Sequence, residues 1–310
     1  MSISYDQRVE VEPSALDIAP VAGRIGAEIR NLSLSADLDD ATISAIRTAL
    51  VTHKVIFFRA QHHLDDAGQE AFAARMGEPI RQPTAAARPE DSGFLLDMKA
   101  KEGYASSLWH TDMTFLAAYP EASILRSLVA PVSGGDTVWA NTAAAYRGLP
   151  EPLRILADNL KAIHGNTTDF DEQYEESVQE KMGDMRHRKA PKLFQAEHPV
   201  VAVHPETGER SLLLGHSFVK RFVGLTSDDS HRLLAIFQDH VTKPENTVRW
   251  RWQPGDVAIW DNRSTQHRSV PDFGDQPRHM RRVTIRGARA TGVDGVASRQ
   301  VKFEQMAATA

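Results

Sequence analysis

The chain has 310 residues, a formal net charge of −5 and no cysteine. This charge gives no basic surface of the kind that binds nucleic acid, and the lack of cysteine excludes disulfides, thiolate nucleophiles and Cys-bound metal centres. No apolar run approaches the roughly 18 residues that span a bilayer, and the first residues lack the layout of a secretion signal. We therefore expect a cytoplasmic protein that binds neither nucleic acid nor membranes and holds any metal on His, Asp or Glu.

The N-terminal part of the chain is predicted to form a supporting layer of helices and strands. A short strand, a helix and a second strand are indicated over 26–29, about 40–52 and 54–59. Asp66 and Gln69 resemble a capping box at the start of a further helix, to which Phe72 and Met76 give an apolar side. Residues 77–106 carry Gly, Pro and Ala without clear periodicity, so we expect mostly loop there.

The rest of the chain is predicted to contain many short strands. Runs bounded by Gly and Pro indicate strands over 122–130, 136–140, 199–204, 210–216, 247–252, 257–260 and 281–286. A helix pair is indicated over about 142–160, and Ser227 or Asp228 is expected to cap a helix that ends near His240. Many short strands separated by such turns favour a barrel or a double-sheet jelly roll. The expected fold is mainly β with flanking helices.

The first candidate for a functional site is His110-Thr111-Asp112. The surrounding stretch reads as extended, and side chains two residues apart on a strand point to the same face, so both would aim into the mouth of a barrel. A solvated loop histidine beside a turn aspartate is the alternative. The second His-x-Asp pair, His63-Leu64-Asp65, lies where a strand gives way to a helix, and N-capping explains its aspartate.

His267 adds a third candidate ligand in the C-terminal third of the chain. Two histidines and one carboxylate can occupy one face of an octahedral metal ion and leave three positions open, as in oxygen-activating non-haem Fe(II) sites. Arg278 and Arg282 share one face of an extended run, whose other face is the apolar Val283 and Ile285. An arginine fork grips a carboxylate bidentately, as a 2-oxo acid with a second carboxylate would require. The alternative is an edge strand charged against aggregation.

The distance along the chain between these ligands predicts a single domain over residues 1–310, because that long stretch must close on itself. The segment of about 166–195 is crowded with charged residues and has few large apolar groups, so it cannot bury much area of its own. We expect it to be a charged lid or insertion that closes over the substrate, with surface decoration as the alternative. The other histidines, His164, His187, His204 and His216, are expected to have packing or surface roles.

Four stretches together resemble the taurine dioxygenase family of Fe(II)- and 2-oxoglutarate-dependent oxygenases, and within it the alkyl-sulfate-cleaving dioxygenases. The likeness extends over roughly residues 20–290 and rests on Val21 to Glu28, Trp109 to Asp112, Gly134 to Asn141, and Trp260 to His267. The resemblance implies a double-stranded β-helix, also called a jelly roll, with helices packed outside. It also implies a homo-oligomer, either a dimer or a tetramer.

The same resemblance implies a cofactor site and its residues. Fe(II) would be held by His110, Asp112 and His267, and the distal carboxylate of the co-substrate 2-oxoglutarate would be held by Thr137 and Arg278.

The resemblance further implies a substrate site for a small anion. Arg282 would face the anionic end of the substrate, and Gln82 stands where sulfate- and sulfonate-binding relatives have a histidine, which weakens the sulfate assignment. A surface loop without a ligand is the alternative for Gln82. Met113 and Phe115 are candidate apolar walls of the pocket, with core packing as their alternative.

The implied reaction consumes O2 and 2-oxoglutarate and yields succinate and CO2. With an alkyl sulfate ester, hydroxylation of the carbon that bears the ester oxygen gives an adduct that collapses to an aldehyde and sulfate. The alternatives within this chemistry are a sulfonate such as taurine, or a phenoxy or other carboxylic acid. A zinc-dependent hydrolase that uses the same three ligands and a non-catalytic binding protein on the same barrel are alternatives of other classes.

Overall fold

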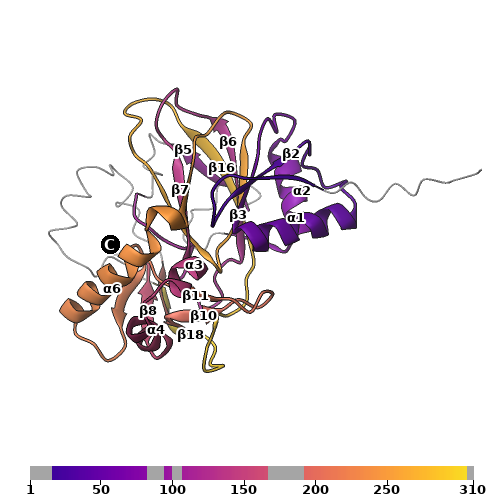
Figure 1. Ribbon diagram of the computed structural model, residues 1–310. Coiled ribbons are helices and arrows are strands. Elements are labelled where there is room, and N and C mark those ends of the chain that lie inside the picture. The colour runs from indigo at the N-terminus through magenta and orange to yellow at the C-terminus, as the bar shows by residue number, and fades with distance from the viewer. Residues whose placement is uncertain (1–15, 82–93, 100–106, 167–191, 306–310) are drawn as a thin grey trace, which may run out of the picture.

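The computed structural model describes residues 16–81, 94–99, 107–166 and 192–305. Within them the protein is mainly β, arranged as two facing sheets with helices outside (Figure 1), which confirms the predicted jelly roll. None of the helices in these ranges is long and apolar enough to cross a membrane.

A large sheet forms one wall of the barrel. Its strands, in spatial order, are β1 (Asp17–Pro20), β2 (Ala27–Arg30), β3 (Val55–Phe58), β14 (Val257–Asp261), β6 (Ala122–Val129), β16 (His279–Ile285) and β4 (Pro79–Ile80), and β5 (Leu96–Lys99) also pairs with β16. The facing sheet consists of β13 (Thr247–Trp250), β7 (Thr137–Asn141) and β15 (Thr265–Ser269).

Two smaller sheets extend the barrel. One has the order β12 (Val219–Phe222), β8 (Lys161–Gly165), β9 (Lys192–Pro199), β18 (Arg299–Gln305), and the other β11 (Arg210–Leu212), β10 (Val201–Val203), β17 (Thr291–Gly292). The helices are α1 (Asp40–His53), α2 (Asp66–Met76), α3 (Thr142–Arg147), α4 (Glu151–Asp158), α6 (Ser227–Val241) and the 3-10 turn η3 (Pro244–Asn246).

The central strands β3 and β14 of the large sheet are buried on both faces, with successive side chains pointing to opposite sides. Ile56 and Phe58 of β3 pack outward with α1 and α2, whereas Val55 and Phe57 pack inward. In β14, Trp260 likewise faces inward, toward the tryptophans of β7 and β13. Figure 1 shows α1 and α2 together on one side of the molecule. The space between the two facing sheets is therefore a dry aromatic core, and the candidate ligands lie beside it.

The helices and about half of the described strands were predicted from the sequence within a few residues, whereas others, among them β5, β8 and β12, were missed. Both predicted helix caps were wrong. The N-cap of α2 is Asp65, whose side chain accepts a hydrogen bond from the backbone of Gly68. Gln69 forms no capping box, because its amide donates to carbonyl oxygens of Ile124 and Arg281 in the large sheet. The N-cap of α6 is Thr226, one residue before Ser227, the earlier of the two predicted caps.

The predicted charged lid over about 166–195 falls mostly on residues 167–191, which lie outside the described residues. Its last residues, from Lys192, belong to β9. The side chain of Asn166 accepts a hydrogen bond from the backbone of Phe194. This bond joins the two ends of that segment, where the end of β8 pairs with the first part of β9.

Candidate metal centre

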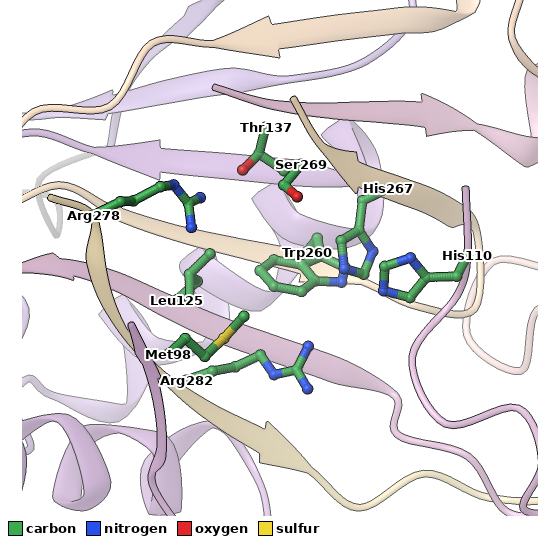
Figure 2. Close-up of a pocket in the computed structure, with 9 residues that line it drawn as sticks. All are labelled: Met98, His110, Leu125, Thr137, Trp260, His267, Ser269, Arg278 and Arg282. Atoms are coloured by element: carbon green, nitrogen blue, oxygen red, sulfur yellow. The ribbon is translucent and has the colours of Figure 1, made fainter. Parts of the chain in front are cut away.

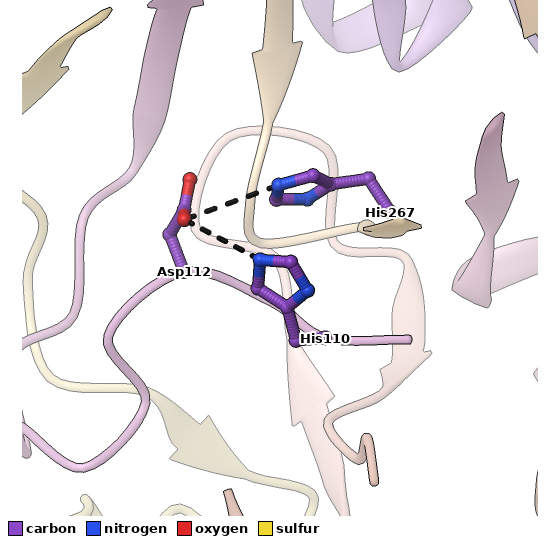
Figure 3. Close-up of side chains that lie close together, drawn as sticks. All are labelled: His110, Asp112 and His267. Carbon is purple, nitrogen blue, oxygen red and sulfur yellow. Dashed lines mark ion pairs between the residues drawn. The ribbon is translucent and has the colours of Figure 1, made fainter. Parts of the chain in front are cut away.

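Side chains of His110, Asp112 and His267 converge on one buried point (Figure 3). Oδ1 of Asp112 lies 3.8 Å from Nε2 of His110 and 3.9 Å from Nε2 of His267. One potential ligand atom of each residue lies within 4.8 Å of the other two. The three residues predicted from sequence to share an ion are thus brought together.

Backbone hydrogen bonds fix the two histidines relative to each other. His110 and His267 form an isolated antiparallel bridge in which each backbone N–H donates to the other residue's carbonyl oxygen, at 3.0 and 2.7 Å. Thr111 strengthens this contact by donating its hydroxyl to the carbonyl oxygen of Thr265. The bridge joins two segments that are remote in the sequence, so the imidazoles stand side by side with ring centroids 4.2 Å apart.

Asp112 reaches the same point from a turn. The prediction that His110 and Asp112 lie on one extended strand was wrong, because the chain leaves the bridge after Thr111 and turns at Met113, whose φ is +50°. This left-handed conformation is uncommon for a residue other than glycine. The turn, rather than strand alternation, directs the carboxylate toward the imidazoles.

The electrostatics of the three side chains suit metal ligation. Nδ1 of His110 lies 2.9 Å from the carbonyl oxygen of Leu108, which can only accept, so Nδ1 carries the proton and the lone pair of Nε2 faces the centre. Burial lowers the pKa of both His110 and His267, which keeps the imidazoles neutral. Burial alone would raise the pKa of Asp112, but Arg282 and the two imidazoles lower it to about 2.

A cavity of about 40 Å³ opens beside the two imidazoles (Figure 2). Its lining combines polar groups with the apolar side chains of Met98, Leu125 and Trp260. His110 and Arg278 lie toward opposite ends of the cavity. A small molecule with a metal-chelating end and an anionic end has the polarity that this cavity can accept.

Thr137 and Arg278 lie together at the end of the cavity remote from His110. Arg278 is 5% exposed, and its Nε donates to the carbonyl oxygen of Gly135 at 3.0 Å. Burial lowers the pKa of Arg278 to about 10, still well above neutral pH, so the guanidinium is cationic. Gly135 has φ +70°, and a Cβ there would lie 2.9 Å from Pro131 and 3.3 Å from Arg278. The Gly-Gly turn therefore lets the backbone approach the guanidinium closely.

Arg282 lies at the metal end of the same cavity. Its Nη1 donates to Oδ1 of Asp112 at 2.6 Å, and the residue is 8% exposed. Arg278 and Arg282 thus both face the cavity, as the alternation along β16 predicted, while Val283 and Ile285 pack on the outer side with α1 and α2.

The remaining predicted substrate residues have different positions. Gln82 lies outside the described residues. Met113 and Phe115 are buried in a small cluster with Phe194, and neither lines the cavity that the described residues form. Met113 directly follows Asp112 in the chain, and the ring of Phe218 contacts both Phe115 and His110.

Several cavity residues were missed in the sequence. Ser269 lines the cavity and pairs in register with Thr137 across β15 and β7. It lies two residues after His267 on the same strand, so alternation from His267 would have found it. Met98, Leu125 and Trp260 carried no polar signal and were not distinguishable from core residues.

Of the histidines expected to have packing or surface roles, His164 and His204 are buried with polar partners and His216 is exposed. His164 and His198 are fully buried with ring centroids 4.8 Å apart, and His164 bonds the hydroxyl of Thr114. His204 pairs with Asp261 at 2.9 Å in a fully buried contact. His187 lies outside the described residues.

The fold and the site together define a class of protein, a jelly-roll barrel with a His-x-Asp pair and a distant histidine at its centre. The sequence matches the profile described as taurine catabolism dioxygenase TauD, TfdA family over residues 17–284. The chain therefore belongs to this family.

Individual relatives are similar over nearly the whole chain. The chain is 57% identical over 289 residues to the alpha-ketoglutarate-dependent sulfate ester dioxygenase of Pseudomonas putida, covering 93% of this chain and 95% of that protein. It is 48% identical over 281 residues to an alkylsulfatase of Acinetobacter baylyi, covering 91% and 88%. The crystal structure of a taurine dioxygenase from Burkholderia xenovorans matches with a TM-score of 0.78 at 35% identity, covering 93% of this chain and 95% of that one.

Proposed function

We propose that this protein is a dioxygenase dependent on Fe(II) and 2-oxoglutarate that cleaves an alkyl sulfate ester to an aldehyde and sulfate, with release of succinate and CO2. The observation that carries the proposal is the convergence of His110, Asp112 and His267 at one end of a cavity whose other end holds the buried cation Arg278. The sulfate ester as substrate is supported by the two relatives at 57% and 48% identity, named for that activity.

The three side chains are close enough to converge on a single metal ion. Ligands on one face of an octahedral ion with bonds of about 2 Å lie roughly 3 Å apart, and the 3.8 and 3.9 Å from Asp112 to the two imidazoles exceed that separation by only about 1 Å. The donor set of two nitrogens and one carboxylate oxygen is that of non-haem Fe(II) oxygenases. His110 offers a lone pair at Nε2 because its Nδ1 proton is held by the carbonyl of Leu108.

The polarity of the cavity suits 2-oxoglutarate as a second ligand beside the metal. Arg278 would hold the distal carboxylate through charge-assisted hydrogen bonds, and Thr137 would donate its hydroxyl, which already accepts from the indole N–H of Trp252. Leu125 and Met98 would cover the methylene groups. When bound, Fe(II) and 2-oxoglutarate together activate dioxygen for the removal of hydrogen from a C–H bond.

Arg282 would anchor the anionic head of the substrate. One of its terminal nitrogens is bonded to Asp112, and the guanidinium has further donors for a sulfate oxygen. Anchoring the anion beside the metal ligands fixes which carbon lies within reach of the oxidant. The walls of Trp260 and Leu125 exclude water from the reacting carbon.

A substrate panel tests this proposal. Succinate and sulfate are measured after incubation of the Fe(II)-loaded protein with 2-oxoglutarate, O2 and alkyl sulfates of several lengths, with taurine and a phenoxy acid in parallel. We expect equal amounts of succinate, sulfate and aldehyde with alkyl sulfates. Succinate formed only with taurine or the phenoxy acid would move the substrate to those classes, and sulfate release without O2 and 2-oxoglutarate would favour a zinc-dependent hydrolase.

A homodimer or homotetramer in the cytoplasm stays a prediction for this chain. Light scattering behind size exclusion would measure the mass of the assembly. Fractionation of cells would test the compartment.

A further inference from the structure

The two carboxylate oxygens of Asp112 have different surroundings. Oδ1 faces both imidazoles, at 3.8 and 3.9 Å, and accepts from Arg282. Oδ2 accepts a hydrogen bond of 2.8 Å from the hydroxyl of Ser123, a fully buried residue of β6. One oxygen is therefore directed toward the metal position while the other is held away from it.

The hydroxyl of Ser123 is itself oriented by two further residues. Asn262 donates from Nδ2 to Oγ of Ser123 at 3.1 Å, and its Oδ1 accepts from Nε1 of Trp260 at 2.9 Å. An indole N–H can only donate, so Trp260 fixes which end of the Asn262 amide is oxygen. The amide nitrogen then faces Ser123, whose own proton is directed to Asp112. The indole of Trp260 therefore fixes which group donates and which accepts in each hydrogen bond from Trp260 to Asp112.

All three residues are buried, with exposures of 0% for Ser123 and 1% each for Asn262 and Trp260. Trp260 also packs its ring on His267, with centroids 4.7 Å apart. The backbone N–H of Asp112 lies 3.4 Å from Oδ1 of Asn262, which adds a weak contact to the same amide. Asn262 therefore contacts the aspartate both through Ser123 and at its backbone.

We propose that Ser123, Asn262 and Trp260 are positioning residues that make Asp112 a one-oxygen ligand; we name them the Asp112 hydrogen-bond chain. This inference rests on the proposed metal site. A carboxylate bound through both oxygens would take a fourth coordination position, whereas the proposed reaction needs three free positions, two for 2-oxoglutarate and one for dioxygen. The Asp112 hydrogen-bond chain keeps the third coordination position free, because it holds Oδ2 in a hydrogen bond.

Metal binding by the Ser123→Ala variant tests the Asp112 hydrogen-bond chain without a measurement of catalytic activity. The apo protein is titrated with Co(II) under argon, and the visible ligand-field spectrum reports both affinity and coordination. We expect a 10- to 100-fold weaker affinity, the usual effect of losing a partner of a metal ligand, together with a changed band shape as Oδ2 becomes free to bind. Ser123→Thr keeps a hydroxyl and is expected to restore affinity and spectrum.

Ser127→Ala is the matched control. Ser127 lies on the same strand and the same face as Ser123, is equally buried, and its hydroxyl has no hydrogen-bond partner among the described residues. The same atom is removed from the same face of the same strand but without loss of a bond to Asp112, so the affinity and spectrum are expected to match those of the unaltered protein.

Trp260→Phe is the second variant, for use if Ser123→Ala does not fold. It keeps an aromatic ring on His267 but removes the donor that orients Asn262, and we expect a several-fold loss of affinity. Failure of the unaltered protein to bind Co(II) would overturn the proposed metal site itself. If the unaltered protein binds Co(II) normally and Ser123→Ala has the same affinity and spectrum, the proposed role of the Asp112 hydrogen-bond chain is wrong and the metal site stands. Where only Trp260→Phe folds, the same result in that variant leads to the same conclusion.

Discussion

Arg278 is a buried cation for which the described residues provide no ion-pair partner. Its Nε donates to a backbone carbonyl, and the remaining guanidinium faces the cavity. Burying a charge costs free energy unless it is paired, and the lowered pKa of Arg278 expresses that cost. A carboxylate bound in the cavity would offset it, so the residue is suited to bind an anion rather than to stabilise the free protein.

Arg278→Met is therefore expected to weaken 2-oxoglutarate binding by about 10- to 100-fold, the loss of a charged hydrogen bond of about 1.5–3 kcal/mol. The affinity for the metal is expected to stay unchanged, because Arg278 lies at the other end of the cavity. Anaerobic titration of the Fe(II) protein, following the visible charge-transfer band of the 2-oxoglutarate chelate, measures both steps.

Arg281→Met is the control for this variant. Arg281 lies in β16, three residues after Arg278, but pairs with Asp66 and Asp97 instead of facing the cavity. It is expected to bind 2-oxoglutarate as the unaltered protein does. Equal losses in the two variants would show that the effect comes from damage to β16 and not from the lost cation.

At the scale of elements, the segment between β11 and β12 supports His110, one of the proposed metal ligands, through Gly215. A Cβ at this position would lie 3.1 Å from both Cα of His110 and the carbonyl oxygen of Trp109, and its φ is +151°. The backbone of Gly215 therefore packs directly on the ligand histidine, and only a residue without a side chain leaves His110 in its bridge with His267.

Gly215→Ala is expected to lower the affinity for Co(II) by roughly 10-fold, since displacing His110 has the effect of losing a support of a metal ligand. Gly208→Ala is the comparison: φ is +70° there, but nothing lies within 4 Å of the added Cβ. It should cost about 1 kcal/mol of stability from backbone strain and leave metal affinity intact. Isothermal titration and thermal unfolding separate the two effects, and unchanged affinity in Gly215→Ala would contradict the proposed contact.

The sequence predicted the elements well where alternation decides the structure. In β16, the inward arginines and the outward Val283 and Ile285 follow from period two alone. The same alternation, for which the sequence carried no prediction, turns Trp260 and Asn262 to one side of the chain and Asp261 to the other side, where it pairs with His204.

Alternation failed where tertiary contacts override it. Asp112 reaches the site through a left-handed turn at Met113, which no local signal marks, since methionine rarely adopts that conformation. Ser123 was read only as part of a strand, because its partner Asp112 lies on a different segment. Gln69 was read as a cap because its partners in the large sheet, Ile124 and Arg281, are distant in sequence.

At the scale of the whole molecule, the metal would link two remote segments of the chain. Ligand binding to the folded state alone stabilises by about 2.7 kcal/mol at 100 times Kd, which raises Tm by about 5 °C for a chain of this size. We expect scanning calorimetry to show such a rise with Mn(II), reversed by a chelator. His267→Ala should show none, and an equal rise in that variant would mean that the ion binds elsewhere.

The position of β14 in the large sheet has a consequence for how the protein is made. This strand lies between β3 and β6, although it follows both by more than a hundred residues. A growing chain on the ribosome therefore holds two strands with a missing neighbour until residues 257–261 have emerged, and exposed edges of this kind invite aggregation. The proposed metal site would be complete only after that strand and His267 have been made, so we expect the protein to acquire its metal late in folding, after the sheet has closed.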